Sequence, residues 1–486
     1  MKRREFLGTV AATGLTPALG EFARAQEDHA LCHPTYASPA DAMKAPPEKF
    51  AFVPAIYVGT ETKRPDYMAT VDIDPKSPTF SKVVGRFEMP NVGDELHHYG
   101  WNACASCHGE RHRRYLVVPG LASGNIYIID AANPAKLKMH KQISGKDIAA
   151  KTNLATPHTV HCLADGTMMI SMLGDAEGNA PGGFLLIDDE FKIKGRWEHD
   201  LGAMKYNYDF WYQPSINAMV SSEWAAPSTV AQGFKLEHVK AGMYGQQLHF
   251  WNWEERKIEQ TIKLGEKGQI PLEVRFHHEP GSTHGFVGAA LSSVIWHWHN
   301  YQKPGADKGT WVAEPVVEVE PVETEGWPFP VPGLITDIVL SLDDKYLYFA
   351  NWLHGDIRQY DVSDPGKPKL TGQVWLGGVI GHKPDTKEPI VGGPQMLQLS
   401  KNGKRLFVTS SLYSVWDNQF YPKMAESGSW MLQIDCDPEN GGMKLNHDFK
   451  VDFGKEPNGP ARAHEIRFPD GDSTSDIYTT PTVAKK

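Results

Sequence analysis

The residues with the clearest chemical potential are two adjacent histidines, His97 and His98, followed closely by the pair Cys104 and Cys107. Imidazole and thiolate are the side-chain ligands that suit soft and borderline metals such as copper, zinc and iron. The segment is polar and flanked by glycine, so a hydrophobic core has little use for it. The pattern therefore predicts a metal or redox site here, with Cys104 and Cys107 as candidate catalytic thiols.

The spacing of Cys104 and Cys107 leaves three chemistries open. The two thiols can form a disulfide, or they can act as a dithiol that acquires copper. Because His108 follows directly, the segment also fits the Cys-x-x-Cys-His pattern of covalent c-type haem attachment. A c-type haem normally sits in a small helical domain, and no helical pattern surrounds these residues. The disulfide and dithiol interpretations are therefore favoured over haem.

Other histidines occur at predicted strand ends or in short turns, far apart in the sequence. A shell made only of imidazoles suits copper, iron or zinc. The candidate metal ligands are His97, His98, His158, His278, His354 and His464. Three carboxylates are candidate bases or partners that orient ligand histidines: Glu223, Asp337 and Glu465. Histidines among charged or polar residues are expected at the surface: His112, His140, His199, His238, His299 and His447.

A short β-rich run that ends near Asp or Asn recurs along the chain at intervals of roughly 45 to 75 residues. Asp165-Gly166 and Asn402-Gly403 supply the turn chemistry of tight hairpins between such runs. Many short strands at a regular period predict an all-β fold, a β-propeller of seven blades. The seven copies begin at Tyr67, Asn125, Phe184, Gln247, Ser293, Asp356 and Met431.

A pair of β-sandwich domains is the alternative architecture. The propeller is preferred because the copies span the chain without a dividing linker, and because ring closure buries strand edges. The candidate histidines fall in different repeats. Since every blade contributes to the axial channel of a propeller, these imidazoles can converge there on one metal ion.

Residues 1–25 have the layout of a bacterial export signal. Arg3 and Arg4 precede a mild apolar run, and Ala23-Arg24-Ala25 offers a cleavage site. A basic amphipathic helix is the alternative interpretation. The layout predicts a twin-arginine signal peptide and a periplasmic protein. Residues 26–486 would then form a single propeller domain, with an N-terminal extension at about 26–50 over the first blade.

Charge and hydropathy exclude several classes of partner. Removing residues 1–25 takes away four basic and two acidic side chains, which changes the formal net charge from −10 to −12. Such a balance argues against nucleic acid and against an anionic membrane surface. The apolar run in the N-terminal segment is too short to span a bilayer, so no membrane insertion is expected.

Several stretches match one known family in order and spacing. They include Asp94-Glu-Leu-His-His98, Tyr208-Asp-Phe-Trp-Tyr-Gln-Pro214, Leu347-Tyr-Phe-Ala-Asn-Trp-Leu-His-Gly-Asp356 and Gly392-Gly-Pro-Gln-Met396. On these residues the chain resembles the selenium-binding protein and methanethiol oxidase family over nearly all of its mature length. One position departs from the vertebrate pattern, because Ser81 stands where those members carry the cysteine linked to selenium. Selenium binding is therefore not expected.

The resemblance implies a β-propeller and a copper-dependent oxidase. Such an enzyme converts methanethiol, O₂ and water to formaldehyde, hydrogen sulfide and hydrogen peroxide. Its partners would be a small thiol and O₂, and the residues leave open whether it is a monomer or a homo-oligomer. The alternative is a non-catalytic propeller that binds thiols, selenium or a protein, since the fold alone does not fix the function.

Changing Arg3 and Arg4 together to Lys should block export, because the twin-arginine pair is the recognised feature of the signal. The mature wild-type protein should begin near Gln26. Intact-mass analysis of the periplasmic fraction measures both outcomes. Periplasmic protein that retains Met1 would contradict the assignment.

Overall fold

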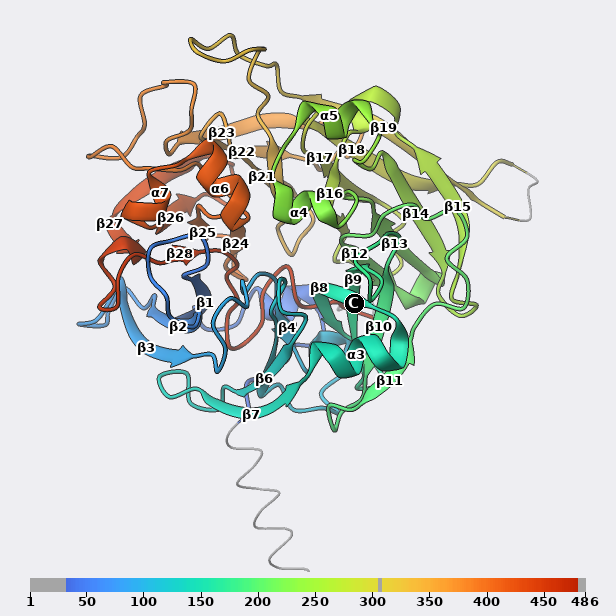
Figure 1. Ribbon diagram of the computed structural model, residues 1–486. Helices are drawn as coiled ribbons and strands as arrows, with labels where there is room; N and C mark the ends of the chain where they lie inside the picture. Colours follow the sequence, from blue (N-terminus) through green and yellow to red (C-terminus); the bar gives the residue numbers. More distant parts are fainter. Residues whose placement is uncertain (1–31, 305–307, 480–486) are drawn as a thin grey trace, which may run out of the picture.

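Seven four-stranded antiparallel sheets surround a central axis in the computed structural model, which describes residues 32–304 and 308–479 (Figure 1). The chain is therefore a seven-bladed β-propeller, and the predicted all-β fold class is confirmed. The predicted signal peptide, residues 1–25, lies outside the described residues. Within the described ranges, no helix has the length and apolar character needed to cross a membrane.

Every blade consists of four strands ordered from the axis outward. The first blade contains β28 (Arg462–Ala463), β1 (Phe50–Ile56), β2 (Tyr67–Asp72) and β3 (Lys82–Glu88). The second contains β4 (Gly100–Trp101), β5 (Tyr115–Pro119), β6 (Ile126–Asp130) and β7 (Lys138–Ile143). The third contains β8 (Ala155–Cys162), β9 (Met168–Gly174), β10 (Gly183–Ile187) and β11 (Ile193–Arg196).

The fourth blade contains β12 (Phe210–Gln213), β13 (Ala218–Ser222), β14 (Gln247–Asn252) and β15 (Lys257–Lys263). The fifth contains β16 (Pro271–Phe276), β17 (Gly285–Ala289), β18 (Val294–Tyr301) and β19 (Thr310–Glu318). The sixth contains β20 (Ile335–Leu340), β21 (Tyr346–Asn351), β22 (Asp356–Asp361) and β23 (Lys369–Trp375). The seventh contains β24 (Leu397–Leu399), β25 (Arg405–Thr409), β26 (Trp430–Cys436) and β27 (Met443–Asp452).

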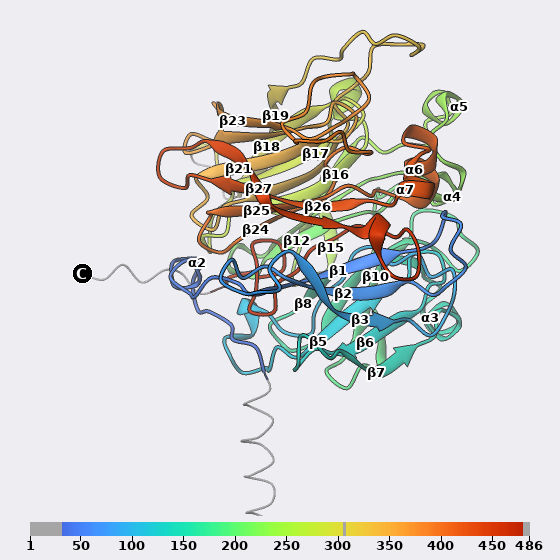
Figure 2. The same ribbon diagram turned by 90° about the vertical axis from the view of Figure 1, so that its left-hand side faces the viewer.

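Short helices occupy the connections between strands. The α-helices are α2 (Pro39–Ala42), α3 (Gly145–Thr152), α4 (Ser228–Gln232), α5 (Leu236–Lys240), α6 (Ser414–Phe420) and α7 (Met424–Ser427). The 3₁₀ helices are η1 (Ala105–Cys107), η2 (Pro214–Ile216), η3 (Gly265–Gly268) and η4 (Phe453–Lys455). Helices α4 and α6 lie at one end of the ring and α2 at the other (Figure 2).

The repeated run found in the sequence is the third strand of every blade: β2, β6, β10, β14, β18, β22 and β26. Third strands are covered on both faces by the neighbouring blades, which explains why the run is rich in apolar side chains. All residues of β2 are buried, whereas only Gly85 is buried in the outermost β3. Gly166 and Gly403, in two of the predicted hairpin turns, adopt φ values of +85° and +71°.

The two ends of the described chain meet in the first blade and close the ring. Strand β28 pairs antiparallel with β1, with Ala55 opposite Ala463 and Ile56 opposite Arg462. The Arg462 guanidinium forms an ion pair of 2.7 Å with the Asp417 carboxylate of α6, and both side chains are fully buried. Closure therefore joins the last strand to both the first and the seventh blade.

The predicted N-terminal extension packs at the α2 end of the ring. His33 pairs with Arg113 of the second blade, and Glu48 forms ion pairs with Lys401 and Arg405 of the seventh. Residues 468–479 lie buried at the same end, where Asp476 pairs with Arg113. Both terminal segments thus cover one mouth of the axial channel.

Replacing Arg462 by Ala should lower the free energy of unfolding by about 3–5 kcal/mol, because the Asp417 carboxylate would remain buried without its partner. Urea unfolding followed by circular dichroism measures the loss. The matched control is Lys192→Ala, which removes an exposed ion pair with Glu190 and should leave the free energy of unfolding essentially unchanged. A loss below about 1 kcal/mol for Arg462→Ala would refute the closing role of this pair.

Candidate functional site

Four of the predicted ligands form one buried cluster beside the axis. His158 lies on the innermost strand β8, His464 directly follows innermost β28, and His97 and His98 precede innermost β4. The ring centroids of His97 and His464 are 3.8 Å apart, and those of His98 and His158 are 4.2 Å apart. Each side chain is at most 2% exposed.

Hydrogen bonds hold one nitrogen of three of these rings. Nδ1 of His98 donates to the Glu465 carboxylate at 3.1 Å, and Nδ1 of His464 donates to the Ser411 carbonyl at 2.6 Å. Nδ1 of His158 contacts the Thr159 hydroxyl at 3.1 Å. All four Nε2 atoms are buried and lack a hydrogen-bond partner. Buried polar atoms are rarely left in this state, so these four nitrogens are candidates to bind a ligand.

The chemistry of the cluster fits a metal ion. Ligand atoms of His97, His98 and His158 lie within 4.8 Å of one another. Burial lowers the pKa of His98 and His464 to about 3, so their rings stay neutral and keep a lone pair. Metal-bound histidines commonly donate the second ring N–H to a carboxylate or a carbonyl, as His98 and His464 do. A set of neutral imidazoles suits copper, zinc or iron.

Two glutamates flank His98. Glu465, a predicted residue, accepts hydrogen bonds from His98 and from the backbone N–H of Tyr99, and it pairs with Arg467. Glu273, on the innermost strand β16, places a carboxyl oxygen 3.5 Å from His98 Nε2. Burial and the nearby Asp209 carboxylate raise the pKa of Glu273 well above its usual range. Glu273 therefore binds a proton beside the cluster more readily than an ordinary glutamate does.

Arg275 connects Glu273 to a wider ionic network along the axis. Its guanidinium lies 2.8 Å from Asp209, 2.9 Å from Glu273 and 3.7 Å from Asp337. Burial opposes ionisation of Asp209, but Arg275, Glu273 and the other nearby groups together outweigh it and lower the pKa to about 2. Burial raises the pKa of Asp337, a predicted residue, to about 7. Asp337 is thus connected to His98 indirectly, because it pairs with Arg275, Arg275 pairs with Glu273, and Glu273 lies beside His98.

Aromatic side chains form one wall of the histidine cluster. Tyr413 stacks on His97 with ring centroids 4.6 Å apart, and Tyr208 lies 4.0 Å from His158. Trp224 packs against both tyrosines. The site therefore combines imidazole nitrogens and carboxyl groups with an apolar surface.

Three predicted residues do not reach this cluster. Nε2 of His354 bonds to the Val331 carbonyl at 2.9 Å, and Nε2 of His278 lies 3.4 Å from the Leu340 carbonyl. Glu223 accepts hydrogen bonds from His249 and from two backbone N–H groups of the segment that leads into the fourth blade. The structure therefore brings four of the six predicted histidines together and places His278 and His354 elsewhere.

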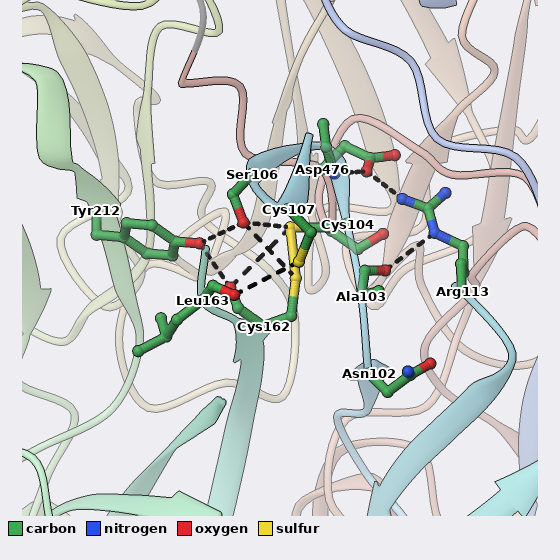
Figure 3. Close-up of a disulfide and its surroundings, with 12 residues drawn as sticks. Asn102, Ala103, Cys104, Ser106, Cys107, Arg113, Cys162, Leu163, Tyr212 and Asp476 are labelled. Carbon is green, nitrogen blue, oxygen red and sulfur yellow. Dashed lines mark hydrogen bonds and ion pairs between the residues drawn. A yellow bond between two sulfur atoms is a disulfide. The ribbon is translucent and has the colours of Figure 1, made fainter. Parts of the chain in front are cut away.

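The cysteines do not form the predicted pair. Cys104 is disulfide-bonded to Cys162 at the end of β8, which leaves Cys107 as a buried thiol (Figure 3). Burial raises the pKa of the Cys107 thiol, and its sulfur lies 3.4 Å from the Leu163 carbonyl. A Cys104–Cys107 disulfide, a copper-acquiring dithiol and haem attachment through both sulfurs are all inconsistent with this pairing. The protonated Cys107 thiol is also a poor nucleophile.

Several residues of the site were not predicted. Glu273 and Arg275 alternate on the otherwise apolar β16, and this two-residue period of charge in an innermost strand was the available signal. His161, three residues after His158 on β8, is buried with both ring nitrogens lacking a hydrogen-bond partner. Two expected surface histidines also differ, because His238 is buried and His299 is half-buried.

Comparison with known proteins identifies the family of this chain. The family model described as 56 kDa selenium-binding protein matches residues 30–479. The chain belongs to this family. A hypothetical selenium-binding protein from Sulfolobus tokodaii, known from an X-ray structure, is 44% identical with a TM-score of 0.86, over 92% of this chain and 99% of that one.

Curated relatives in this family carry the name methanethiol oxidase. The Xenopus laevis protein is 52% identical over 92% of this chain and 98% of its own length. The Homo sapiens protein is 53% identical over the same shares. A Mus musculus relative that is 51% identical is named selenium-binding protein 2.

The stability cost of replacing His161 by Gln should depend on pH. Burial lowers the pKa of His161 to about 3, against about 6.5 in an unfolded chain. Between these values the unfolded wild-type chain binds a proton that the folded chain does not, so acidification destabilises the wild type more than the variant. As the pH falls, the unfolding free energy of the wild type should decrease relative to that of the variant by up to about 1.4 kcal/mol per pH unit. Urea titrations of metal-free protein at pH 7.5 and 5.0 measure it, and an unchanged difference would refute the interpretation.

Proposed function

We propose that this chain is a copper-dependent methanethiol oxidase whose metal is held by His97, His98, His158 and His464. The observation that carries the proposal is a group of four buried, closely packed imidazoles whose Nε2 atoms lack hydrogen-bond partners. Ligand atoms of His97, His98 and His158 lie within 4.8 Å of one another, and the His464 ring stacks on His97. The relatives named methanethiol oxidase, which align over nearly their whole length, support the same activity. The reaction proposed is methanethiol, O₂ and water giving formaldehyde, hydrogen sulfide and hydrogen peroxide.

Bound copper would supply a cation that favours the deprotonated thiol and a redox partner for electron transfer toward O₂. The protein's own groups fix the ligand set. Glu465 accepts the Nδ1 proton of His98, and the Ser411 carbonyl accepts that of His464, so each ring presents Nε2 to the centre. Arg467 pairs with Glu465 and holds that carboxylate in place.

The surroundings suit a small apolar thiol. Tyr208, Tyr413 and Trp224 offer aromatic faces beside the imidazoles, where a methyl group can pack. The site has almost no exposed surface, and burial excludes bulk water from the reacting group. A short substrate fits this arrangement better than a long or charged one.

Glu273 is the proposed proton-handling residue. Its carboxyl lies 3.5 Å from His98 Nε2 and 2.9 Å from Arg275, on the axis side of β16. In this position it can exchange a proton with a group bound at the histidines, and Arg275 stabilises the carboxylate that remains. Asp209 and Asp337 share the same arginine and balance its charge.

The proposed place of action is the periplasm, reached through the twin-arginine segment. The position expected for the family's selenium-linked cysteine is Ser81, whose hydroxyl bonds to the backbone of Lys450 in the seventh blade. A serine hydroxyl in this role gives no support for selenium binding. We therefore propose thiol oxidation, not selenium binding, as the function of this chain.

His158→Gln and His464→Gln should each lose bound copper and lower methanethiol-dependent O₂ consumption at least about 100-fold, because each removes one metal–nitrogen bond. Elemental analysis gives the copper content, an oxygen electrode gives the turnover, and circular dichroism checks the fold.

The matched control is His354→Gln. His354 is equally buried, but its ring bonds to a backbone carbonyl that the glutamine amide can also reach. This variant should retain copper and turnover. If His158→Gln or His464→Gln keeps both, the four-histidine centre is wrong. Loss of copper with His354→Gln alone would move the centre to the sixth blade.

A further inference from the structure

A second histidine cluster lies on the fifth blade. His297 and His299 occupy alternate positions of β18, so they share one face of the sheet. Phe286 of β17 lies opposite His297, and Phe286 packs with apolar residues of the sixth blade. His284, directly before β17, completes the group. The cluster therefore sits between the fifth and sixth blades, in a different part of the ring from the four axial histidines.

The three rings are arranged for a common ligand. Nδ1 of His284 and Nε2 of His297 are 2.8 Å apart. The two ring planes differ by only 2° with centroids 5.1 Å apart, so the rings meet edge to edge with nitrogens facing each other. The His299 ring lies 5.5 Å from that of His284 and 5.3 Å from that of His297. Ligand atoms of all three lie within 4.8 Å of one another.

Some ring nitrogens of this cluster have no hydrogen-bond partner. A neutral His284–His297 pair can share one proton, but Nδ1 of His299 is buried without a hydrogen-bond partner. Nε2 of the adjacent His277 is in the same state. Protonation is disfavoured, since burial and the neighbouring imidazoles lower the pKa of His297 to about 4. Neutral rings with inward lone pairs are the ligand form of histidine.

Access and spacing favour a late transition metal taken up from solvent. His284 and His299 are half-buried, unlike the fully buried axial histidines, so an ion can enter from outside. Metal–nitrogen bonds of about 2.0–2.1 Å put adjacent ligand atoms about 2.9 Å apart in a square plane and about 3.3 Å apart in a tetrahedron. The 2.8 Å separation of His284 Nδ1 and His297 Nε2 is that of a hydrogen bond, so a metal held by both nitrogens would displace the shared proton. Neutral imidazole ligands suit Cu²⁺ and Zn²⁺.

We propose that His284, His297 and His299 form a second metal site that binds Cu²⁺ and, more weakly, Zn²⁺. All three ligands come from one β-hairpin of the fifth blade and the residue before it, away from the axial histidines. It is independent of the axial centre and is not needed for turnover. The weaker binding of Zn²⁺ follows the usual order of divalent affinities.

The test uses full-length mature protein without a histidine tag, stripped of metal with a chelator. Equilibrium dialysis against Cu²⁺ and elemental analysis give the bound equivalents for wild type and for His284→Gln/His299→Gln. These two positions are half-buried, so the variant should fold, and circular dichroism checks it. The variant should bind one Cu²⁺ fewer than wild type and keep its oxidase activity. The same loss of one equivalent should appear when both proteins also carry His97→Gln/His158→Gln.

The matched control is His140→Gln/His447→Gln, which removes two exposed strand histidines. It should bind as many equivalents as wild type. Equal Cu²⁺ binding by wild type and His284→Gln/His299→Gln would overturn the proposal, and so would an equal loss in the control. If the axial histidines bind no copper, introducing His97→Gln/His158→Gln would leave the number of bound Cu²⁺ ions unchanged. This outcome is separate from the test of the second site.

Discussion

The pairing of β28 with β1 is the constraint on which the rest of the structure depends. An open stack of blades would expose two sheet edges and would not hold the innermost strands around one axis. Only two residue pairs form this ladder, and the buried Arg462–Asp417 ion pair adds a contact to the seventh blade. The histidine cluster draws on β28, β4 and β8, which are the innermost strands of the first three blades. Closure therefore creates the site as well as the ring.

The buried charged side chains along the axis each lie close to a side chain of opposite charge. Arg275 is surrounded by Asp209, Glu273 and Asp337, and Arg467 pairs with Glu465. Buried ion pairs seldom add stability over well-packed apolar side chains, because desolvation offsets the attraction. The ion pairs instead position the carboxyl groups. They hold particular carboxyl groups beside His98 and influence the pKa of each one, in a region that bulk water does not reach.

The fold could be predicted because one physical property repeats with every blade. Third strands are covered on both faces, so their apolar runs stand out in the sequence seven times. His97, His98, His158 and His464 were predicted because they come from three different repeats, in segments where a blade was expected to meet the axis. The same criterion failed for His354, which follows β21, a second strand whose turn lies away from the axis. It failed for His278 because this residue lies beyond the far end of innermost β16.

The cysteines show a different limit of sequence reasoning. Cys104 and Cys107 are close in sequence, but the true partner of Cys104 is Cys162, 58 residues away on the neighbouring innermost strand. Spacing along the chain says nothing about which strands the ring will place side by side. Glu273 was overlooked for a related reason, since its importance comes from facing His98 across the axis, a relation that appears only once the blades are arranged.

The place of His464 in the chain has a consequence for biosynthesis. A ribosome completes His97, His98 and His158 long before it reaches His464, so a growing chain carries three of the four imidazoles without the fourth. The full cluster cannot exist in any nascent chain that stops short of β28. An ion held by all four rings, as proposed above, could therefore enter only after β28 has closed the ring.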